Sequence, residues 1–312
     1  MPKLTVVVPA FNESAVLREF HRRLRSVLDP LPLQTDVLYV DDGSSDDTWS
    51  IIQTLIAESP HTGALKLSRN FGKEAALTAG LDAVTADAAV VIDADLQDPP
   101  ELIPALIEQW QAGYDVVYAT RSAREGESGF KRFTAAAFYR GMERVSDTAI
   151  PRDTGDFRLL SRRALDALGK LRERQRFMKG LFSWIGYRQT AVHYQREPRQ
   201  AGSTKWNYWR LTQLAIEGIT SFSTAPLRLA TWVGLASAGM AFVYGLWVLT
   251  RTLIYGDSVR GYPTLMLVIL FLGGVQLLAL GVIGEYLGRN YAESKQRPLY
   301  FIEEEHLPLR AD

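Results

Sequence analysis

The sequence predicts an α/β domain with a mainly parallel sheet, followed by two helices that cross a membrane. In the first two-thirds of the chain, short β-branched and apolar runs alternate with segments of helical spacing, a pattern typical of parallel strands covered by helices. The last third instead contains two long uncharged apolar stretches. Each is long enough to cross a bilayer, which takes roughly 20 residues of helix.

Composition limits the possible functions. The 312 residues include 35 basic and 35 acidic side chains. The chain has no excess of basic residues, so a nucleic-acid partner is not expected. Cysteine is absent from the sequence. Disulfides, thiolate metal sites and cysteine nucleophiles are therefore excluded.

Five apolar runs are expected as strands. They are Leu4–Val8, Val37–Val40, Leu65–Leu67, Ala88–Ile92 and Val116–Tyr118. Segments with helical spacing, such as Glu13–Leu28 and Glu101–Trp110, lie between them. The apolar run after Met1 is too short for a signal peptide and fits a first strand. Because ligands of such sheets bind beyond the carboxyl ends of the strands, the polar residues after each run are the candidates for a site.

The two apolar stretches are Leu229–Thr250 and Gly261–Gly284. Basic residues flank the pair at Arg228, Arg289, Lys295 and Arg297, and two more, Arg251 and Arg260, lie in the short connection. The positive-inside rule favours both ends of the pair in the cytoplasm. We therefore expect a multi-pass protein of the inner membrane with its polar domain on the cytoplasmic side.

Asp93, Asp95 and Gln97 follow the run Ala88–Ile92 at alternate positions, which places three oxygen donors on one side of an extended segment. Carboxylate and amide oxygens suit Mg²⁺ or Mn²⁺. The alternative is that these acids only end the strand. For Asp98 we expect that simpler role, as a cap of the following helix. No dinucleotide fingerprint or P-loop occurs, so a bound phosphate would need such a cation to neutralise its charge.

Two other strand ends have more than one reading. Asp41 and Asp42 precede Gly43, and such a group often forms a plain turn, but a carboxylate there could also accept from a base N–H or a ribose hydroxyl. Asn12 and Glu13 could contact a nucleotide or simply open the next helix.

The polar segment after the third run is Ser68–Lys73, and it overlaps the start of Phe71–Gly80. The small residues of Phe71–Gly80 suit packing of a helix on the sheet. Only Arg69 and Lys73 remain as candidates for a functional role there.

Four segments occur together in an order that resembles a known family. They are Val7–Glu13 (VVPAFNE), Val40–Ser44 (VDDGS), Asp93–Pro100 (DADLQDPP) and Asp153–Leu159 (DTGDFRL). With the paired apolar stretches, they closely resemble the polyisoprenyl-phosphate glycosyltransferases of family 2, which have the Rossmann-like GT-A fold. Bactoprenol glucosyltransferases are the nearer members and dolichol-phosphate mannose synthases the more distant ones. The resemblance runs from about residue 3 to about residue 290.

The resemblance implies roles for individual residues. Asp93, Asp95 and Gln97 would serve a metal ion, Mg²⁺ or Mn²⁺, and the diphosphate. The residues implied in nucleotide binding are Pro9, Asn12, Glu13, Asp41, Asp42, Lys73 and Asp93. Asp95 and Asp156 would be catalytic, Asp156 as the base of the family. An acceptor phosphate monoester has a second pKa of about 6 and needs little deprotonation, so Asp156 could instead orient the acceptor or Arg158, or simply pair with Arg158.

A basic and aromatic region precedes the first apolar stretch. The residues expected to hold the acceptor phosphate are Arg121, Lys131, Arg199, Ser203 and Lys205. Trp206, Tyr208 and Trp209 follow, and apolar residues recur at helical spacing to Phe222, which predicts an amphipathic helix at the membrane surface. A solvated basic face that attracts anionic lipids is the alternative.

The expected organisation has four parts. They are a GT-A domain at 1–200, an interface helix region at 201–228, two transmembrane helices at 229–290 and a cytoplasmic tail at 291–312. Small residues four apart, at Gly234 with Ala238 and at Gly284 with Gly288, permit close helix contact. A homo-oligomer is therefore possible, and the resemblance implies a tetramer.

The predicted reaction is inverting transfer of one sugar from a nucleotide diphosphate to a polyprenyl phosphate, with UDP-glucose and undecaprenyl phosphate as the substrates. Mannose from GDP-mannose, or a modified aminoarabinose from its UDP donor, would use the same chemistry. A processive polysaccharide synthase is disfavoured because no Q-x-x-R-W segment occurs. A membrane-anchored protein that binds nucleotide sugars without turnover is the alternative of another class.

Overall fold

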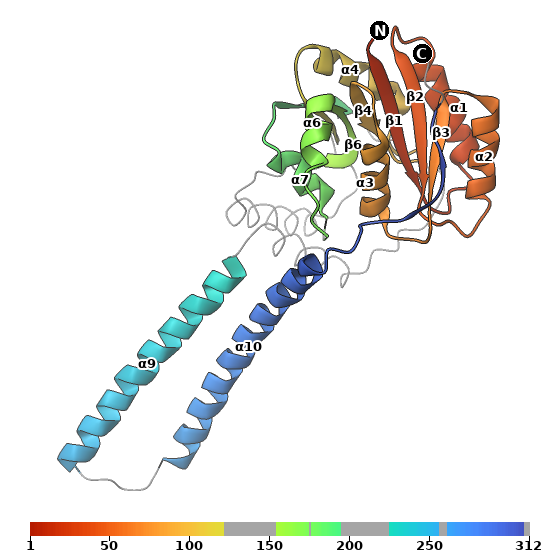
Figure 1. Ribbon diagram of the computed structural model, residues 1–312. Helices are drawn as coiled ribbons and strands as arrows, with labels where there is room; N and C mark the ends of the chain where they lie inside the picture. Colours follow the sequence, from red (N-terminus) through yellow and green to blue (C-terminus); the bar gives the residue numbers. More distant parts are fainter. Residues whose placement is uncertain (122–153, 175, 195–224, 256–260, 309–312) are drawn as a thin grey trace. The chain divides into compact units, whose positions relative to one another are not determined.

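The computed structural model describes residues 1–121, 154–174, 176–194, 225–255 and 261–308. The chain divides into two compact units. The first contains the sheet and includes the C-terminal residues from Arg297 onward, and the second contains two long helices (Figure 1). The mixed α/β class predicted from the sequence is confirmed.

One sheet of eight strands forms the first unit, within the described residues. Its order is β7-β5-β6-β4-β1-β2-β3-β8. The strands are β1 Lys3–Ala10, β2 Gln34–Asp41, β3 Thr62–Leu67, β4 Ala88–Val91, β5 Val116–Arg121, β6 Thr154–Ser161, β7 Gln189–Tyr194 and β8 Ile302–His306. β4, β1, β2 and β3 are mutually parallel, as expected, whereas β6 pairs antiparallel with both β4 and β5.

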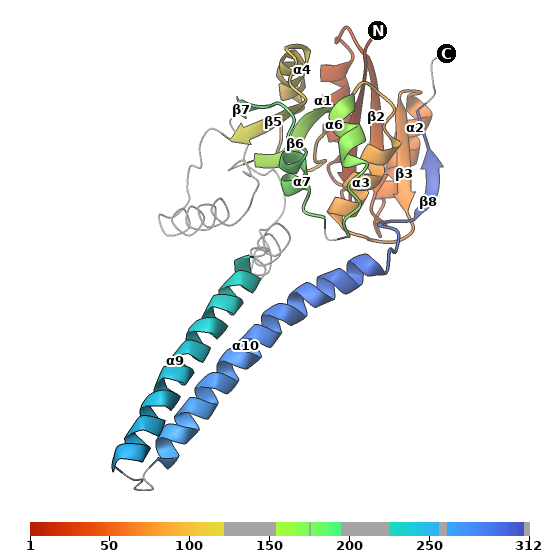
Figure 2. The same cartoon turned by 60° about the vertical axis from the view of Figure 1, so that its left-hand side comes forward.

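Helices cover the sheet. They are α1 Leu17–Leu28, α2 Thr48–Glu58, α3 Lys73–Ala83, η1 Pro100–Leu102, α4 Ile103–Gln111, α6 Arg162–Leu168 and α7 Met178–Trp184. α3 lies on one face, and α1 and α2 lie on the other (Figures 1 and 2). Strands covered on both faces are apolar along their whole length, which is why the predicted strands read as continuous apolar runs.

The amphipathic pattern of α1 explains its packing. Leu17, Phe20, Leu24 and Leu28 recur every three or four residues, and all four are at most 1% exposed. Burying each such side chain contributes about 2 kcal/mol. The helix begins at Leu17 rather than at Glu13, because residues 11–16 are used in the loop at the end of β1.

Strand β8 was missed in the sequence. It pairs antiparallel with β3, Ala64 opposite His306, at the edge of the sheet (Figure 2). Its sequence, IEEEH, lacks the alternation of a half-buried strand, and the charges suit an exposed edge. Gly63 allows the close approach, since a Cβ there would lie 2.4 Å from Pro308 Cδ. Part of the expected tail at 291–312 is thus part of the sheet.

The second unit is a pair of helices, α9 Ala225–Tyr255 and α10 Tyr262–Ser294. Each contains a span long and apolar enough to cross a membrane, Leu229–Tyr255 and Val268–Ser294. Only 6% and 0% of the most apolar windows of these spans are buried inside the protein. Exposed large apolar side chains along such long helices are typical of lipid contact rather than of a soluble core.

Candidate active site

The candidate residues gather at one edge of the sheet. Because β1, β2 and β4 are parallel, their carboxyl ends lie at the same edge, with Ala10 opposite Asp41. The loops that leave this edge are bonded to one another. Ser45 N–H donates to Asn12 Oδ1 at 2.9 Å, and Glu13 N–H donates to Thr48 Oγ1 at 2.9 Å. Asn12 has a φ of 56°, a conformation that asparagine tolerates.

Pro9 lies within β1, opposite Val40. The strand ends at Ala10, one residue later, and the loop that contains Asn12 and Glu13 follows. The structure therefore brings the first predicted nucleotide segment to the same edge as the aspartates after β2.

Asp41 and Asp42 are both buried but make different contacts. Asp41 is 0% exposed and accepts a long hydrogen bond, 3.3 Å, from the Ser44 backbone N–H. Asp42 accepts from the Phe71 and Gly72 backbone N–H groups with its two oxygens, at 2.8 and 2.9 Å. Burial raises the pKa of both carboxyls. Asp42 thus fixes the loop before α3, where Gly72 has a φ of 97°.

Asp95 and Gln97 form a local pair after β4. The Gln97 side-chain amide donates to Asp95 Oδ2 at 2.6 Å, and its backbone N–H donates to Asp95 Oδ1 at 3.1 Å. Leu96, between them, has a positive φ of 59°, so the chain turns here and is not the extended segment that the sequence analysis expected. Gln97 is only 4% exposed, so this turn is a fixed part of the edge.

The donor set after β4 fits a hard divalent cation in its chemistry. Its ligands would be two carboxylates and one amide oxygen, all of the type that Mg²⁺ and Mn²⁺ prefer. In the part of the chain that the structure describes, no three histidine, cysteine, aspartate or glutamate side chains converge as a metal site. The cation would therefore need oxygen atoms of a substrate to complete its coordination, as is usual for Mg²⁺.

Lys73 joins Asp93, in the loop after β4, to Asp156. Its ammonium donates to Asp93 Oδ2 at 2.7 Å and to Asp156 Oδ2 at 2.6 Å. Burial opposes the charge of Lys73, but the two carboxylates outweigh this effect and raise its pKa. Burial likewise opposes the charge of Asp156, yet Lys73 and the nearby Lys179 leave its pKa below the usual range. For Asp93 burial prevails and the pKa is raised.

The Asp156 carboxylate bonds to Lys73 rather than to Arg158, so the alternative of a simple pair with Arg158 is wrong. The Arg158 guanidinium donates to the backbone oxygens of Gly155 and Asp156 and stacks 3.9 Å from the Phe182 ring. Burial lowers the pKa of Arg158 to about 10, so it remains charged at neutral pH. The carboxylate of Asp156 pairs with Lys73 instead, and its Oδ1 is buried without a partner among the described residues.

Two residues that the sequence analysis missed lie beside Asp156. Glu74 and Lys179 both interact electrostatically with it, and burial lowers the pKa of Lys179. Glu74 follows Lys73 in a segment that we assigned to helix packing. Lys179 is in α7, more than 80 residues along the chain from Asp93, and no motif marks it.

Glu74 provides a test of the electrostatics. Burial raises its pKa to about 7. A carboxyl whose folded pKa lies above its unfolded value costs stability as pH rises from the unfolded pKa, and the cost is complete above the folded pKa. Wild type should therefore lose more thermal stability between pH 5 and pH 8 than Glu74→Gln, which cannot ionise. Melting temperatures in detergent check this, with the exposed Glu108→Gln as control. Equal pH slopes in wild type and Glu74→Gln would contradict it.

The cap predicted at Asp98 is also wrong. Pro99 occupies the N-cap position of η1, and the Asp98 carboxylate accepts a short hydrogen bond from the Tyr194 hydroxyl. Both residues are buried, at 4% and 7% exposure. This contact ties the loop after β4 to the carboxyl end of β7.

Removing that hydroxyl should destabilise the fold. Tyr194→Phe leaves a buried carboxylate without this donor, which costs about 1–3 kcal/mol. In a domain of this size, the melting temperature should fall by about 2–4 °C for each kcal/mol. Thermal unfolding in detergent measures the change, and Tyr187→Phe, at a half-buried tyrosine, is the control. A loss no larger than that of the control would show that the contact contributes nothing.

The predicted acceptor-binding set is hardly represented. Arg121 ends β5 opposite Tyr194, and nothing is described of its side chain. The other members, Lys131, Arg199, Ser203 and Lys205, lie outside the described residues, as does the expected interface helix from Trp206 to Phe222. Their role remains a prediction.

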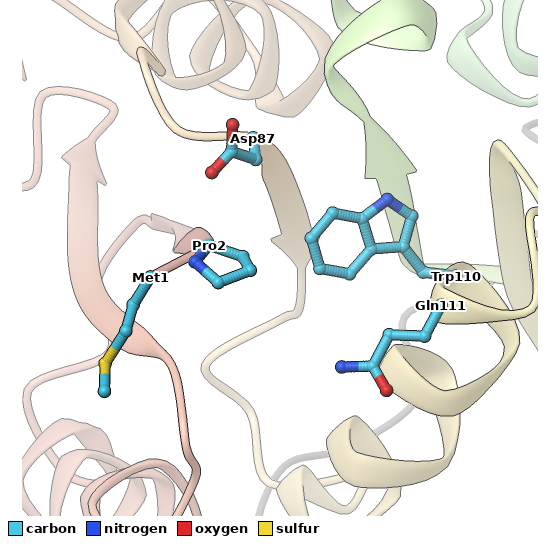
Figure 3. Close-up of a pocket in the computed structure, with 5 residues that line it drawn as sticks. All are labelled: Met1, Pro2, Asp87, Trp110 and Gln111. Carbon is cyan, nitrogen blue, oxygen red and sulfur yellow. The ribbon is translucent and has the colours of Figure 1, made fainter.

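A separate cavity of about 660 Å³ is lined by Met1, Pro2, Asp87, Trp110 and Gln111 (Figure 3). Met1 and Pro2 precede β1 and Asp87 precedes β4, so the cavity is at the amino ends of these strands. The candidate residues lie at the opposite, carboxyl ends of the same strands. The cavity therefore contributes nothing to the site.

Comparisons with known proteins all relate this chain to glycosyl transferases. The model of glycosyl transferase family 2 matches residues 5–169, and that of the GtrB C-terminal hairpin matches residues 225–289. A prophage bactoprenol glucosyl transferase homolog of Escherichia coli is 48% identical over 96% of this chain and 98% of its own. A bactoprenol glucosyl transferase of Shigella phage SfV is 49% identical over 97% of this chain and 99% of its own.

Solved structures resemble the chain more distantly. A glucosyl-3-phosphoglycerate synthase from Mycobacterium tuberculosis, in complex with Mn²⁺, UDP and phosphoglyceric acid, is 20% identical with a TM-score of 0.48. The match covers 70% of this chain and 76% of that one.

Proposed function

We propose, on the premise that this chain belongs to glycosyl transferase family 2, that it transfers glucose from UDP-glucose to undecaprenyl phosphate. The observation that carries this proposal is the identity of 48–49% with bactoprenol glucosyl transferases over nearly the whole chain. Two apolar helices match the C-terminal hairpin of such proteins. A polar sheet domain joined to a membrane anchor suits an enzyme with one water-soluble and one lipid substrate.

The donor would bind across the loops after β1, β2 and β4. The buried Asp41 carboxylate is an acceptor for a base N–H or a ribose hydroxyl, and Asp42 holds the adjoining loop through Phe71 and Gly72. Asp93, Asp95 and Gln97 would hold Mg²⁺ or Mn²⁺, which would neutralise the charge on the leaving diphosphate. The donor set supports this assignment.

We assign Asp156 to the part of the site that would bind the acceptor phosphate. Its carboxylate is ionised beside Lys73 and Lys179, which keep its pKa low. An acceptor phosphate is largely dianionic at neutral pH because its second pKa is about 6. The acceptor therefore needs almost no deprotonation by Asp156. We assign Asp156 instead to orienting the two lysines and the acceptor. Attack opposite the leaving diphosphate would invert the anomeric configuration.

The remaining parts of the proposal concern the membrane. The sheet domain would face the cytoplasm of the inner membrane, residues 201–228 would lie at the interface, and copies of the chain would form a homo-oligomer. The basic residues that flank the hairpin, such as Arg228 and Arg297, support the orientation.

The direct test is formation of the glycolipid. Membranes that contain the protein are incubated with undecaprenyl phosphate and a panel of nucleotide sugars, and the lipid products are identified by mass spectrometry. We expect a hexose adduct from UDP-glucose. A product from another donor only would change the sugar, and no product from any donor, in membranes that retain the folded protein, would overturn the transferase proposal.

A further inference from the structure

Lys73 has a position that helix stability does not explain. It is the first residue of α3, and a positive charge at a helix N-terminus is unfavourable to the helix dipole. The preceding Gly72 is held in place by Asp42. The lysine is therefore presented at this point by a fixed loop, and the reason for its charge must lie in what its side chain contacts.

The contacts of Lys73 come from two different strands. Asp93 follows β4 and Asp156 lies in β6, and these strands pair antiparallel with Val91 opposite Arg158. The two carboxylates are 28% and 13% exposed, so water screens their repulsion poorly. A single ammonium bonds both, at 2.7 and 2.6 Å. In this arrangement Lys73 supplies the positive charge that the pair of carboxylates requires.

We propose that Lys73 is an internal counter-cation, which competes with a divalent metal ion for Asp93 and passes to the diphosphate of the donor when both bind. The inference rests on the proposed function, because it concerns the same metal and donor site. The Lys73 side chain is 44% exposed on a flexible stem, so it can leave Asp93 without disturbing α3. Lys73 is thus a positioning residue that links donor binding to Asp156.

The competition between Lys73 and the metal ion predicts the direction in which UDP changes the metal affinity. Without nucleotide, a metal ion that binds Asp93 must displace an ammonium or tolerate its repulsion. With UDP, the diphosphate gives Lys73 another anionic partner, and this cost disappears. UDP should therefore increase the affinity of wild type for metal, partly through Lys73.

The experiment measures Mn²⁺ affinity of the full-length protein in detergent by electron paramagnetic resonance, with and without UDP. Lys73→Met should bind Mn²⁺ about fivefold more tightly than wild type when UDP is absent, and the increase caused by UDP should be smaller by a similar factor. Lys73→Arg, which keeps the charge, should resemble wild type. Lys170→Met, at an exposed lysine after α6, controls for the loss of any lysine.

Thermal stability gives a second readout that does not depend on turnover. In chelator, Lys73→Met should melt below wild type because Asp93 and Asp156 then lack their shared cation. Mn²⁺ should raise the melting temperature of Lys73→Met more than that of wild type. A purely structural lysine would give the first effect without the second.

The outcomes separate the two proposals. If wild type binds Mn²⁺ and makes glycolipid, but Lys73→Met binds Mn²⁺ no more tightly without UDP, the counter-cation role of Lys73 is overturned and the proposed function stands. If wild type makes no glycolipid and binds no Mn²⁺ with or without UDP, both proposals fail.

Discussion

Asp156→Asn should reduce sugar transfer by about 10³-fold, within the range expected for loss of a charged group at a reacting centre. The substitution keeps the size of the side chain but removes the charge that Lys73 and Lys179 face. With that charge gone, the two lysines lose their common partner and the acceptor loses its orientation. Donor binding should change by no more than about twofold, because the hydrogen bonds that link the loops after β1 and β2, and those within the Asp95–Gln97 turn, do not involve Asp156.

The measurement separates turnover from binding. Glycolipid formation is followed with radiolabelled UDP-glucose in membranes, and donor affinity is measured by titration of the purified protein. Asp166→Asn is the matched control, since Asp166 is an exposed aspartate that pairs with Arg162 in α6. Turnover near that of wild type would remove Asp156 from the reacting centre, and a large loss of donor affinity would assign it to the donor half.

The central strands could be predicted because each is recognisable from its own short run of residues. The runs Leu4–Val8 and Val37–Val40 are continuous and apolar, and they lie within β1 and β2. Because the carboxyl ends of parallel strands lie together, the sequence alone predicts that Asn12, Asp41 and Asp93 are close to one another. Element ends were less accurate, since loop contacts rather than side-chain periodicity decide where α1 begins.

The parts that could not be predicted depend on long-range contacts. β8 is recognisable only through its pairing with β3, since three successive glutamates give it no strand pattern. Asp98 was assigned to a cap because its partner, Tyr194, is 96 residues away. The link from Lys73 to Asp93 and Asp156 required the antiparallel pairing of β6 with β4, which no local pattern indicates.

Asp95→Asn should lower sugar transfer by about 10³-fold and weaken metal-dependent donor binding. Asparagine retains one oxygen, which can accept from the Gln97 backbone N–H, so the backbone of the turn after β4 should keep its shape although the bond from the Gln97 side-chain amide is lost. What is lost is a negative charge in a donor set of only two carboxylates and one amide. The substitution therefore tests the charge of the site without dismantling its backbone.

Binding of UDP-glucose with and without Mn²⁺ measures this effect directly. In wild type, Mn²⁺ should strengthen donor binding, and in Asp95→Asn this increase should be largely lost while metal-free binding stays the same. Asp47→Asn, at an exposed aspartate before α2 without a side-chain capping bond, is the control. Full transfer activity of the wild type in excess chelator would contradict the metal assignment, because the oxygen donors after β4 would then have no cation to hold.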